Sequence, residues 1–223
     1  MSINVVVDIS HHNGKIDFVK AASAGIACVI HKATQGVRFV DPNYHRHREQ
    51  ALAAGLLWGA YHFGTSANST RQADHFLRTV DPEIHTLLVL DYEPNGKWTM
   101  TLAQAKEFVT RVKTMTGRFP GLYAGSLIKE KLASKSKDPI LSQCFLWIAQ
   151  YALAPTGIPP TWPTWTLWQY TDGVEGPEPH SVDGIGLCDR NRFNGTFVGL
   201  RRLWGITAKA RKRKRRRSTK LNS

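Results

Sequence analysis

The sequence predicts an α/β fold, built as a closed and irregular TIM-like barrel. Segments typical of strands and helices alternate over the first half of the chain, most strand-like segments are continuous apolar runs, and about eight strands are expected in all. Continuous apolar strands are typical of parallel sheets covered on both faces, and alternation with helices favours parallel pairing. A length of 223 residues suits one such barrel as a single domain.

Five strands are expected in the first half of the chain, at Val5–Ile9, Cys28–Lys32, Leu57–Phe63, Leu87–Asp91 and Gly121–Ala124. Three longer helices are expected between them, at Asp41–Gly55, Ser69–Thr79 and Thr101–Thr116. Asp41 is suited to cap the first of these helices and either Thr99 or Thr101 the third, and Gly55 and Gly117 are suited to end them. This part of the chain therefore has the strand–helix rhythm of a parallel barrel.

The rhythm changes after residue 124. The segment Ile128–Ala133 allows only a short helix. Three later strands are expected at Phe145–Ala149, Trp165–Tyr170 and Ile185–Asp189, joined by loops rich in Pro and Gly. These links have no room for crossover helices, so we expect antiparallel pairing among the last strands.

The chain divides into a barrel over residues 1–204 and a polybasic tail over 205–223. The formal net charge is +13, and nine basic residues between 209 and 220 leave the barrel near +4 once they are subtracted. Strong self-repulsion without apolar periodicity predicts that this tail is disordered.

Three interpretations of the tail remain open: a solvated terminus, docking on anionic envelope polymers or lipid, and use with nucleic acid or in nuclear import. No aromatic residues interleave with its charges, so base stacking is not supported and nucleic acid is not the expected partner.

Other whole-chain features exclude several classes of protein. Three cysteines without a pairing pattern predict buried thiols and no disulfide framework. No apolar run reaches 18 residues, so no transmembrane helix is expected. The first residues lack the basic and apolar regions of a cleavable signal peptide. We therefore expect a protein that works inside the cell or leaves it without a cleaved leader.

Acidic residues stand at the ends of several predicted strands. They are Asp8, Asp91, Glu93 and Asp189. Catalytic groups of parallel barrels come from the carboxyl ends of strands, so four carboxylates from three strands are expected to meet at one mouth. A single acid at such a position is commonly a helix cap or an ion-pair partner, but four at equivalent positions indicate a site.

Asp91 and Glu93 are two residues apart, which places both on the same face of a strand, about 6.6 Å apart. Glycoside hydrolysis needs such a pair, with one group protonating the leaving oxygen and the other stabilising positive charge or activating a nucleophile. Crowding raises the proton affinity of at least one member. We expect the longer Glu93 to be the proton donor and Asp91 the charged stabiliser. The alternatives are a structural acid pair or a metal site, although no His-x-Glu motif or Asp/Asn-rich loop accompanies them.

Aromatic residues cluster at the same strand ends, where they could stack on sugar rings or form core. They are Tyr61, Phe63, Tyr123, Trp147, Tyr151, Trp168 and Tyr170. Of these we expect Tyr61, Tyr123 and Trp168 in the cleft. His11, His12 and His62 are expected to line the cleft or to make loop hydrogen bonds, because sequence neighbours point apart in extended chain. No metal or cofactor is expected.

Sequence blocks in a fixed order resemble glycoside hydrolase family 25, the Chalaropsis-type lysozymes. The blocks are Asp8–Gly14, Val29–Gly36, Asp41–Tyr44, Gly59–Phe63, Leu90–Glu93, Leu146–Tyr151, Trp168–Thr171 and Asp189–Phe193. His31 and Phe18 depart from the commonest pattern, but neither replaces a carboxylate.

The resemblance implies a (β/α)5(β)3 barrel and N-acetylmuramidase activity on peptidoglycan, without a cofactor. It implies that Glu93 is the general acid, that Asp91 orients or stabilises an oxazolinium formed by the substrate, and that Asp8 and Asp189 bind and tune the pair. The expected substrate-binding residues are Tyr61, Lys32, Tyr123, Trp147, Trp168 and Gln169.

Two other functions are left open by the residues alone. One is a chitinase-like hydrolase, because an Asp-x-Glu at the end of the fourth strand also serves substrate-assisted chitinases. The other is a barrel that binds glycan without cutting it. For the muramidase we expect a monomer that is cytoplasmic until released onto the cell wall, as an endolysin is, or that is exported by a leaderless route.

Overall fold

Eight strands close into a barrel in the computed structural model, which describes residues 1–133 and 136–207. The hydrogen-bonded order is β1-β11-β8-β7-β6-β5-β4-β2, and β1 pairs with β2 to complete the ring. The strands are β1 (Ile3–Ile9), β2 (Cys28–Gln35), β4 (Leu57–Phe63), β5 (Leu87–Asp91), β6 (Gly121–Ala124), β7 (Leu146–Ala149), β8 (Leu167–Thr171) and β11 (Asp189–Phe193). The predicted closed, irregular α/β barrel is confirmed.

Short additional strands lie outside the ring. β3 (Phe39–Val40) pairs with the end of β2, and β9 (Ser181–Val182) and β10 (Gly186–Leu187) form a separate two-stranded ribbon. The strand β3 and the ribbon of β9 and β10 both lie in connections at one end of the barrel.

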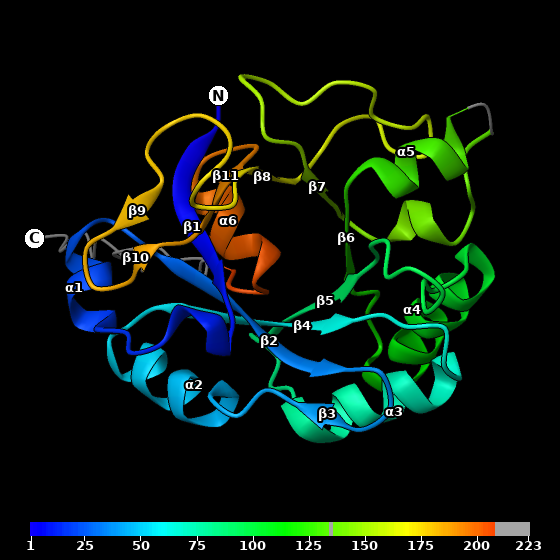
Figure 1. The fold of residues 1–223 in the computed structure, drawn as a ribbon, viewed down its shortest axis with the longest axis horizontal. Helices are drawn as coiled ribbons and strands as arrows, with labels where there is room; N and C mark the ends of the chain where they lie inside the picture. Colours follow the sequence, from blue (N-terminus) through cyan, green and yellow to red (C-terminus); the bar gives the residue numbers. More distant parts are fainter. Residues whose placement is uncertain (134–135, 208–223) are drawn as a thin grey trace, which may run out of the picture.

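The helices that follow one another round the outside of the strands (Figure 1) are α1 (Phe18–Ser23), α2 (Tyr44–Ala53), α3 (Ser69–Val80), α4 (Leu102–Thr116) and α5 (Ser126–Leu132). In the same view α6 (Phe197–Leu203) lies within the ring of strands, and its Leu200 packs with the side chains inside the barrel. Of the two caps that the sequence offered for α4, Thr101 is the one used, and Gly117 ends the helix as predicted, with φ of 78°. The sequence did not predict α1 and α6, which have six and seven residues and are too short to show a helical period.

The start of α2 was predicted wrongly at Asp41. The helix begins at Tyr44 because the Asp41 carboxylate is engaged elsewhere: Oδ2 accepts from the backbone N–H of His11 at 3.0 Å, and Oδ1 from that of Asn43 at 3.0 Å. Asp41 therefore ties the loop after β1 to the start of α2 instead of capping the helix.

The last strand was also predicted wrongly, at Ile185–Asp189. Asp189 begins β11, and the residues before it belong to β10 and its turn. The expected antiparallel pairing among the last strands is confirmed for β8 with β11. The last strand also pairs antiparallel with β1, which the sequence did not predict. It is wrong for β7 with β8, which pair in parallel because the loop of residues 150–166 spans the return without a helix.

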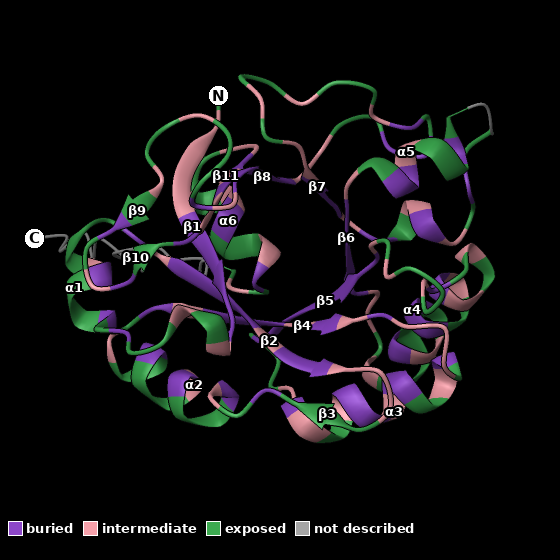
Figure 2. Ribbon diagram, in the orientation of Figure 1, coloured by how far each residue is buried: buried purple, intermediate pink, exposed green. Residues whose placement is uncertain are grey.

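The core has an inner and an outer layer. Inside the barrel lie mainly strand side chains, with Leu200 and Trp204 of the α6 region. The larger outer layer packs the strands against the helices, which expose only their outer faces (Figure 2). The Trp204 indole donates to the Trp58 carbonyl at 2.9 Å, so α6 is fixed against the barrel.

The three cysteines are buried and unpaired, as predicted. None of the helices in residues 1–133 and 136–207 is long and apolar enough to cross a membrane. The predicted tail follows α6, and its residues from 208 onward, including the basic run at 209–220, lie outside the described residues.

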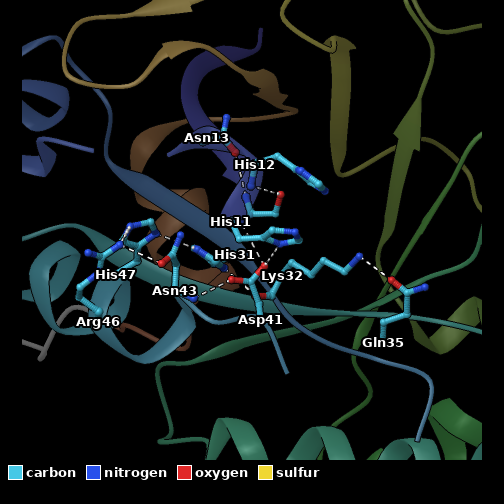
Figure 3. A network of polar contacts seen from close by, with 11 residues as sticks. His11, His12, Asn13, His31, Lys32, Gln35, Asp41, Asn43, Arg46 and His47 are labelled. Atoms are coloured by element: carbon cyan, nitrogen blue, oxygen red, sulfur yellow. Dashed lines mark hydrogen bonds and ion pairs between the residues drawn. The ribbon is translucent and has the colours of Figure 1, made fainter. Parts of the chain in front are cut away.

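Several histidines are structural. His31 is fully buried between β2 and α2; its ring nitrogens lie 2.6 Å from the Lys32 carbonyl and 3.0 Å from His47 Nδ1 (Figure 3). His11 contacts the Asp41 carboxylate at 2.7 Å, which is the expected loop hydrogen bonding. His62 was expected near the cleft, but its side chain is buried on the outer side of the barrel. There its ring stacks on that of Phe108, with the two ring centres 4.9 Å apart.

The buried His62 makes the stability of the barrel depend on pH. Burial lowers the pKa of His62 from its ordinary value of 6.5 to about 3. The unfolded chain therefore binds a proton at this site below about pH 6.5, while the folded chain does not until about pH 3. The contribution of neutral His62 is complete above pH 6.5 and is lost progressively as the pH falls toward 3.

We predict that urea unfolding will show the stability advantage of the wild type over His62→Gln shrinking between pH 6.5 and 4. The exposed His45 offers a matched control, and His45→Gln should track the wild type over the same range. An advantage over His62→Gln that stays constant with pH would contradict the assignment of His62 as a buried neutral group.

Candidate active site

Four carboxyl groups meet at one end of the barrel, as predicted. Asp8 is near the end of β1, and its register partner in β11 is Asp189. Asp91 ends β5 beside Tyr123 of β6, and Glu93 follows two residues later. Because β11 is antiparallel to β1, the start of β11 lies beside the end of β1. An acid at the start of a strand therefore joins acids at the ends of two others.

These groups line a cleft of about 270 Å³, which we call the acidic cleft. Its lining residues are Asp8, Tyr61, Asp91, Glu93, Tyr123, Trp147, Tyr151, Gln169, Asp172 and Asp189. Within the described residues, no group of three or more His, Cys, Asp or Glu side chains has the arrangement of a metal site. The cleft is thus a carboxyl site walled by aromatic side chains.

Asp8 is held by two amides. Gln169 Nε2 donates to its two oxygens at 3.1 and 3.2 Å, and Asn191 Nδ2 donates to Oδ1 at 2.7 Å. The oxygen of each amide is held by a second hydrogen bond. Trp147 Nε1 donates to Asn191 Oδ1 at 2.7 Å, and the Tyr123 hydroxyl donates to Gln169 Oε1 at 2.8 Å. With both amide oxygens occupied by donors, both amides present N–H groups to Asp8, which favours its anionic form.

Asp8 and Asp189 hold one proton between them near neutral pH. Burial and the adjacent charge of Asp8 raise the pKa of Asp189 to about 9. Burial also raises the pKa of Asp8, but hydrogen bonds from Asn191, Gln169 and Asp189 oppose that rise. The proton therefore resides on Asp189, which donates to an anionic Asp8.

Asp91 and Glu93 form the second crowded pair. Burial raises the pKa of both, and the charge of Glu93 raises that of Asp91 further. Two like charges this close cannot both be ionised at low cost, so the pair retains a proton near neutral pH. Asp91 Oδ1 is buried and makes no hydrogen bond within the described part of the chain.

Lys32 supplies positive charge beside the cleft. Burial lowers the pKa of its ammonium, and the charges of Asp91, Asp41 and Glu93 oppose that effect. Its Nζ donates to Gln35 Oε1 at 2.7 Å and lies 4.9 Å from the centre of the Phe63 ring. Lys32 is not among the residues that line the acidic cleft, so the structure places it at the margin.

The other predicted substrate-binding residues divide into three groups. Tyr61, Tyr123 and Gln169 line the cleft as expected. Trp147 also lines it but is 1% exposed, and its indole serves Asn191. Trp168 lies outside the cleft: neighbours in a strand face opposite sides, so Gln169 points inward and Trp168 packs outside, where it donates to the Gln150 carbonyl at 2.8 Å.

Three functional positions were not predicted as site residues: Tyr151, Asp172 and Asn191. Asp172 follows the last residue of β8, so the rule that selected Asp8 and Asp91 could have found it. Asn191 is two residues after Asp189 in β11 and so shares its inward face. The Tyr151 hydroxyl reaches Gln169 Oε1 at 3.0 Å from a loop, and strand periodicity does not apply there.

A barrel with two crowded carboxyl pairs in an aromatic-walled cleft has the site expected of a glycoside hydrolase. The model of the glycosyl hydrolases family 25 matches residues 7–178. The chain therefore belongs to glycosyl hydrolase family 25, and the predicted resemblance is confirmed.

Individual relatives agree with this assignment. The chain is 30% identical to the N,O-diacetylmuramidase of Chalaropsis sp over 88% of this chain and 96% of that protein. It is 28% identical to lysozyme M1 of Streptomyces globisporus over 91% of this chain and 71% of that protein. Among solved structures, a bacterial lysozyme from Streptomyces coelicolor superposes with a TM-score of 0.77 at 31% identity, covering 91% of this chain and 97% of that one.

We predict that Asn191→Leu raises the pKa of Asp8, because it removes an N–H donor from the anionic carboxylate. Carbon-13 NMR of the side-chain carboxyls should show the lower-pH titration step of the Asp8–Asp189 pair moving to higher pH. Asn194→Leu is the matched control, because Asn194 follows the other end of β11 and bonds to Thr164 and Trp165 instead. An unshifted step in Asn191→Leu would show that this amide does not hold Asp8 anionic.

Proposed function

We propose that this protein is a peptidoglycan hydrolase of the lysozyme type, an N-acetylmuramidase. The bond cleaved is the β-1,4 linkage between N-acetylmuramic acid and N-acetylglucosamine. Its membership of glycosyl hydrolase family 25 and its relatives named as lysozyme and N,O-diacetylmuramidase support the substrate. The observation that carries the chemistry is the proton-retaining pair of Asp91 and Glu93 at the end of β5, with Asp91 Oδ1 unpaired among the described residues.

In this proposal Glu93 protonates the oxygen that leaves the sugar. Asp91 accepts the N–H of the substrate's acetamido group and so orients the acetamido oxygen toward the anomeric carbon. That oxygen forms a bond to carbon as the glycosidic bond breaks, which gives an oxazolinium. Water then attacks the same carbon, the Glu93 carboxylate takes its proton, and the oxazolinium ring opens to release the product.

In this scheme the binding of substrate itself places the proton on the general acid, Glu93. A substrate N–H donated to Asp91 stabilises the anionic form of Asp91, so the proton of the pair moves to Glu93. Anionic Asp8 and the nearby Lys32 help to set the charge of the cleft, which contains ionised and protonated carboxyls side by side. The pair thus becomes a general acid and a charged orienting group when the acetamido group is bound.

The two alternative functions are less well supported. Relatives named for muramidase activity do not favour a chitinase-like enzyme. A barrel that only binds glycan would not need four carboxyls in one cleft, yet all four are present.

Replacing Glu93 tests the proposal directly. We predict that Glu93→Gln lowers turnover of purified cell walls by about 10²–10⁴-fold, the usual contribution of a general acid, while the protein stays folded. Mass spectrometry of wild-type digests should find new reducing ends on N-acetylmuramic acid. Glu83→Gln, at an exposed carboxylate remote from the cleft, is the matched control and should retain full activity. Reducing ends only on N-acetylglucosamine, or full activity in Glu93→Gln, would refute the proposal.

We further propose that the protein acts as a monomer, since one chain supplies every group lining the cleft. It would reach the wall by endolysin-like release or by export. The basic run at 209–220, outside the described residues, would dock on anionic envelope polymers or lipid. His85 Nδ1 lies 3.2 Å from the Trp204 carbonyl just before β5 begins. The last described residues therefore lie near the start of β5, at the end of the barrel opposite the cleft.

Replacing the seven basic residues 211–217 by glutamine tests this docking. Polybasic segments gain roughly 1 kcal/mol per residue near an anionic surface, so wall binding at low salt should weaken at least about tenfold and lose most of its salt dependence. Walls stripped of anionic polymers are the control, and on them wild type and variant should bind alike. An unchanged salt dependence on intact walls would rule out docking by this segment.

A further inference from the structure

A second hollow lies at the same end of the barrel as the acidic cleft. It has a volume of about 360 Å³ and is lined by Gln35, Thr65, Ser66, Ala67, Asn95 and Trp98; we call it the Trp98 hollow. Its walls come from the chain directly after β2, β4 and β5. It therefore opens at the same end of the barrel as Asp91 and Glu93, and none of its residues lines the acidic cleft.

Trp98 is exposed but firmly placed. Its side chain is 58% exposed, whereas its backbone is held by two hydrogen bonds: its N–H donates to the Asn95 carbonyl at 2.9 Å, and its carbonyl accepts from Ser66 N–H at 2.7 Å. Lys97 Nζ lies 5.1 Å from the centre of the indole ring. A single exposed aromatic residue needs no explanation by itself. An exposed indole on an anchored loop offers a large flat contact at little cost in conformational entropy.

The polar groups around Trp98 suit a hydroxylated ligand. Gln35 uses its amide oxygen to accept from Lys32, which leaves its amide N–H groups free to donate (Figure 3). Asn95 and Ser66 add an amide and a hydroxyl to the same hollow, whereas the Thr65 hydroxyl donates to Gln72 Oε1 at 3.1 Å. A sugar ring presents an apolar face edged by hydroxyls, so a flat aromatic group ringed by amides and hydroxyls matches its chemistry.

The two hollows are joined by the chain and by contacts. Glu93 and Trp98 are five residues apart, so their Cα atoms lie within about 17 Å of each other. Gly64, just before Thr65, donates its N–H to the Asp91 carbonyl at 2.9 Å. Lys32 interacts with residues of both hollows: its charge acts on Asp91 and Glu93 of the acidic cleft, and its Nζ donates to Gln35 of the Trp98 hollow. A polymer bound at the acidic cleft can therefore continue into the Trp98 hollow.

We propose that the Trp98 hollow binds a sugar ring of the same glycan strand, away from the cleaved bond, with the ring stacked on the Trp98 indole. The inference rests on the proposed function, because it takes the strand in the acidic cleft to be the polymer that continues. It assigns to Trp98 a preference for long strands over short oligosaccharides. The ligand is sugar and not the peptide stem, because the lining residues are an aromatic platform and neutral donors. The charge of Lys97 lies near the indole ring but does not line the hollow.

The test compares Trp98→Ala with the wild type on long glycan strands and on the shortest oligosaccharide that the wild type cleaves. Both substrates are freed of peptide. We expect the ratio of kcat/KM on long strands to that on the short substrate to fall about tenfold in Trp98→Ala, mostly through KM. Trp98→Phe should recover part of the ratio. Phe197→Ala is the matched control, because Phe197 is 49% exposed and starts α6, beyond the end of β11 remote from the cleft.

A binding measurement separates this inference from the proposed function. Affinity for peptide-free strands is measured by calorimetry in a Glu93→Gln background, with and without Trp98→Ala. A tenfold weaker affinity on loss of the indole supports the sugar site even if turnover gives unexpected products. Equal affinities and an unchanged long-to-short ratio would overturn it. An effect of Trp98→Ala seen only on strands that retain peptide would also overturn it, in favour of a peptide contact.

Discussion

The antiparallel pairing of β11 with β1 is the constraint on which the site depends. It closes the barrel and sets Asp189 opposite Asp8, and two residues further along it turns Asn191 toward the same carboxylate. Without this closure Asp8 would lose one of its two amide partners and its proton-bearing neighbour. The same strand leads into α6, whose following Trp204 is fixed to the carbonyl of Trp58 in β4. One strand thus joins the chemistry at one end of the barrel to packing at the other.

Crowding then decides what the four carboxyls can do. Burial raises the pKa of each, and the members of each pair affect one another's titration. The amides of Gln169 and Asn191 remove the symmetry of the first pair, since they favour charge on Asp8 and leave the proton to Asp189. No comparable donors hold Asp91, whose Oδ1 is unpaired among the described residues. The second pair is therefore the one whose proton a ligand can redistribute, which is the property that a general acid needs.

Much of this was accessible from the sequence. Apolar runs located the early strands, and strand ends located Asp8, Asp91 and Glu93, because both depend on local periodicity. The error over the last strand had a different origin: Asp189 looked like a strand end, and only the pairing partner shows that it begins β11. Trp168 was misplaced because the aromatic signal was read without the alternation that turns Gln169 inward. Asn191 and Tyr151 act through long-range hydrogen bonds, which no local pattern records.

The central claim is that the cleft holds two protons near neutral pH, one in each carboxyl pair. Neutron diffraction from deuterated crystals near pH 7 would measure this directly, because it locates deuterons on individual oxygens. The account predicts one deuteron on Asp189 directed at Asp8 and one deuteron within the Asp91–Glu93 pair, with Asp8 bare. Four bare carboxylates, or a deuteron on Asp8 with Asp189 ionised, would contradict it.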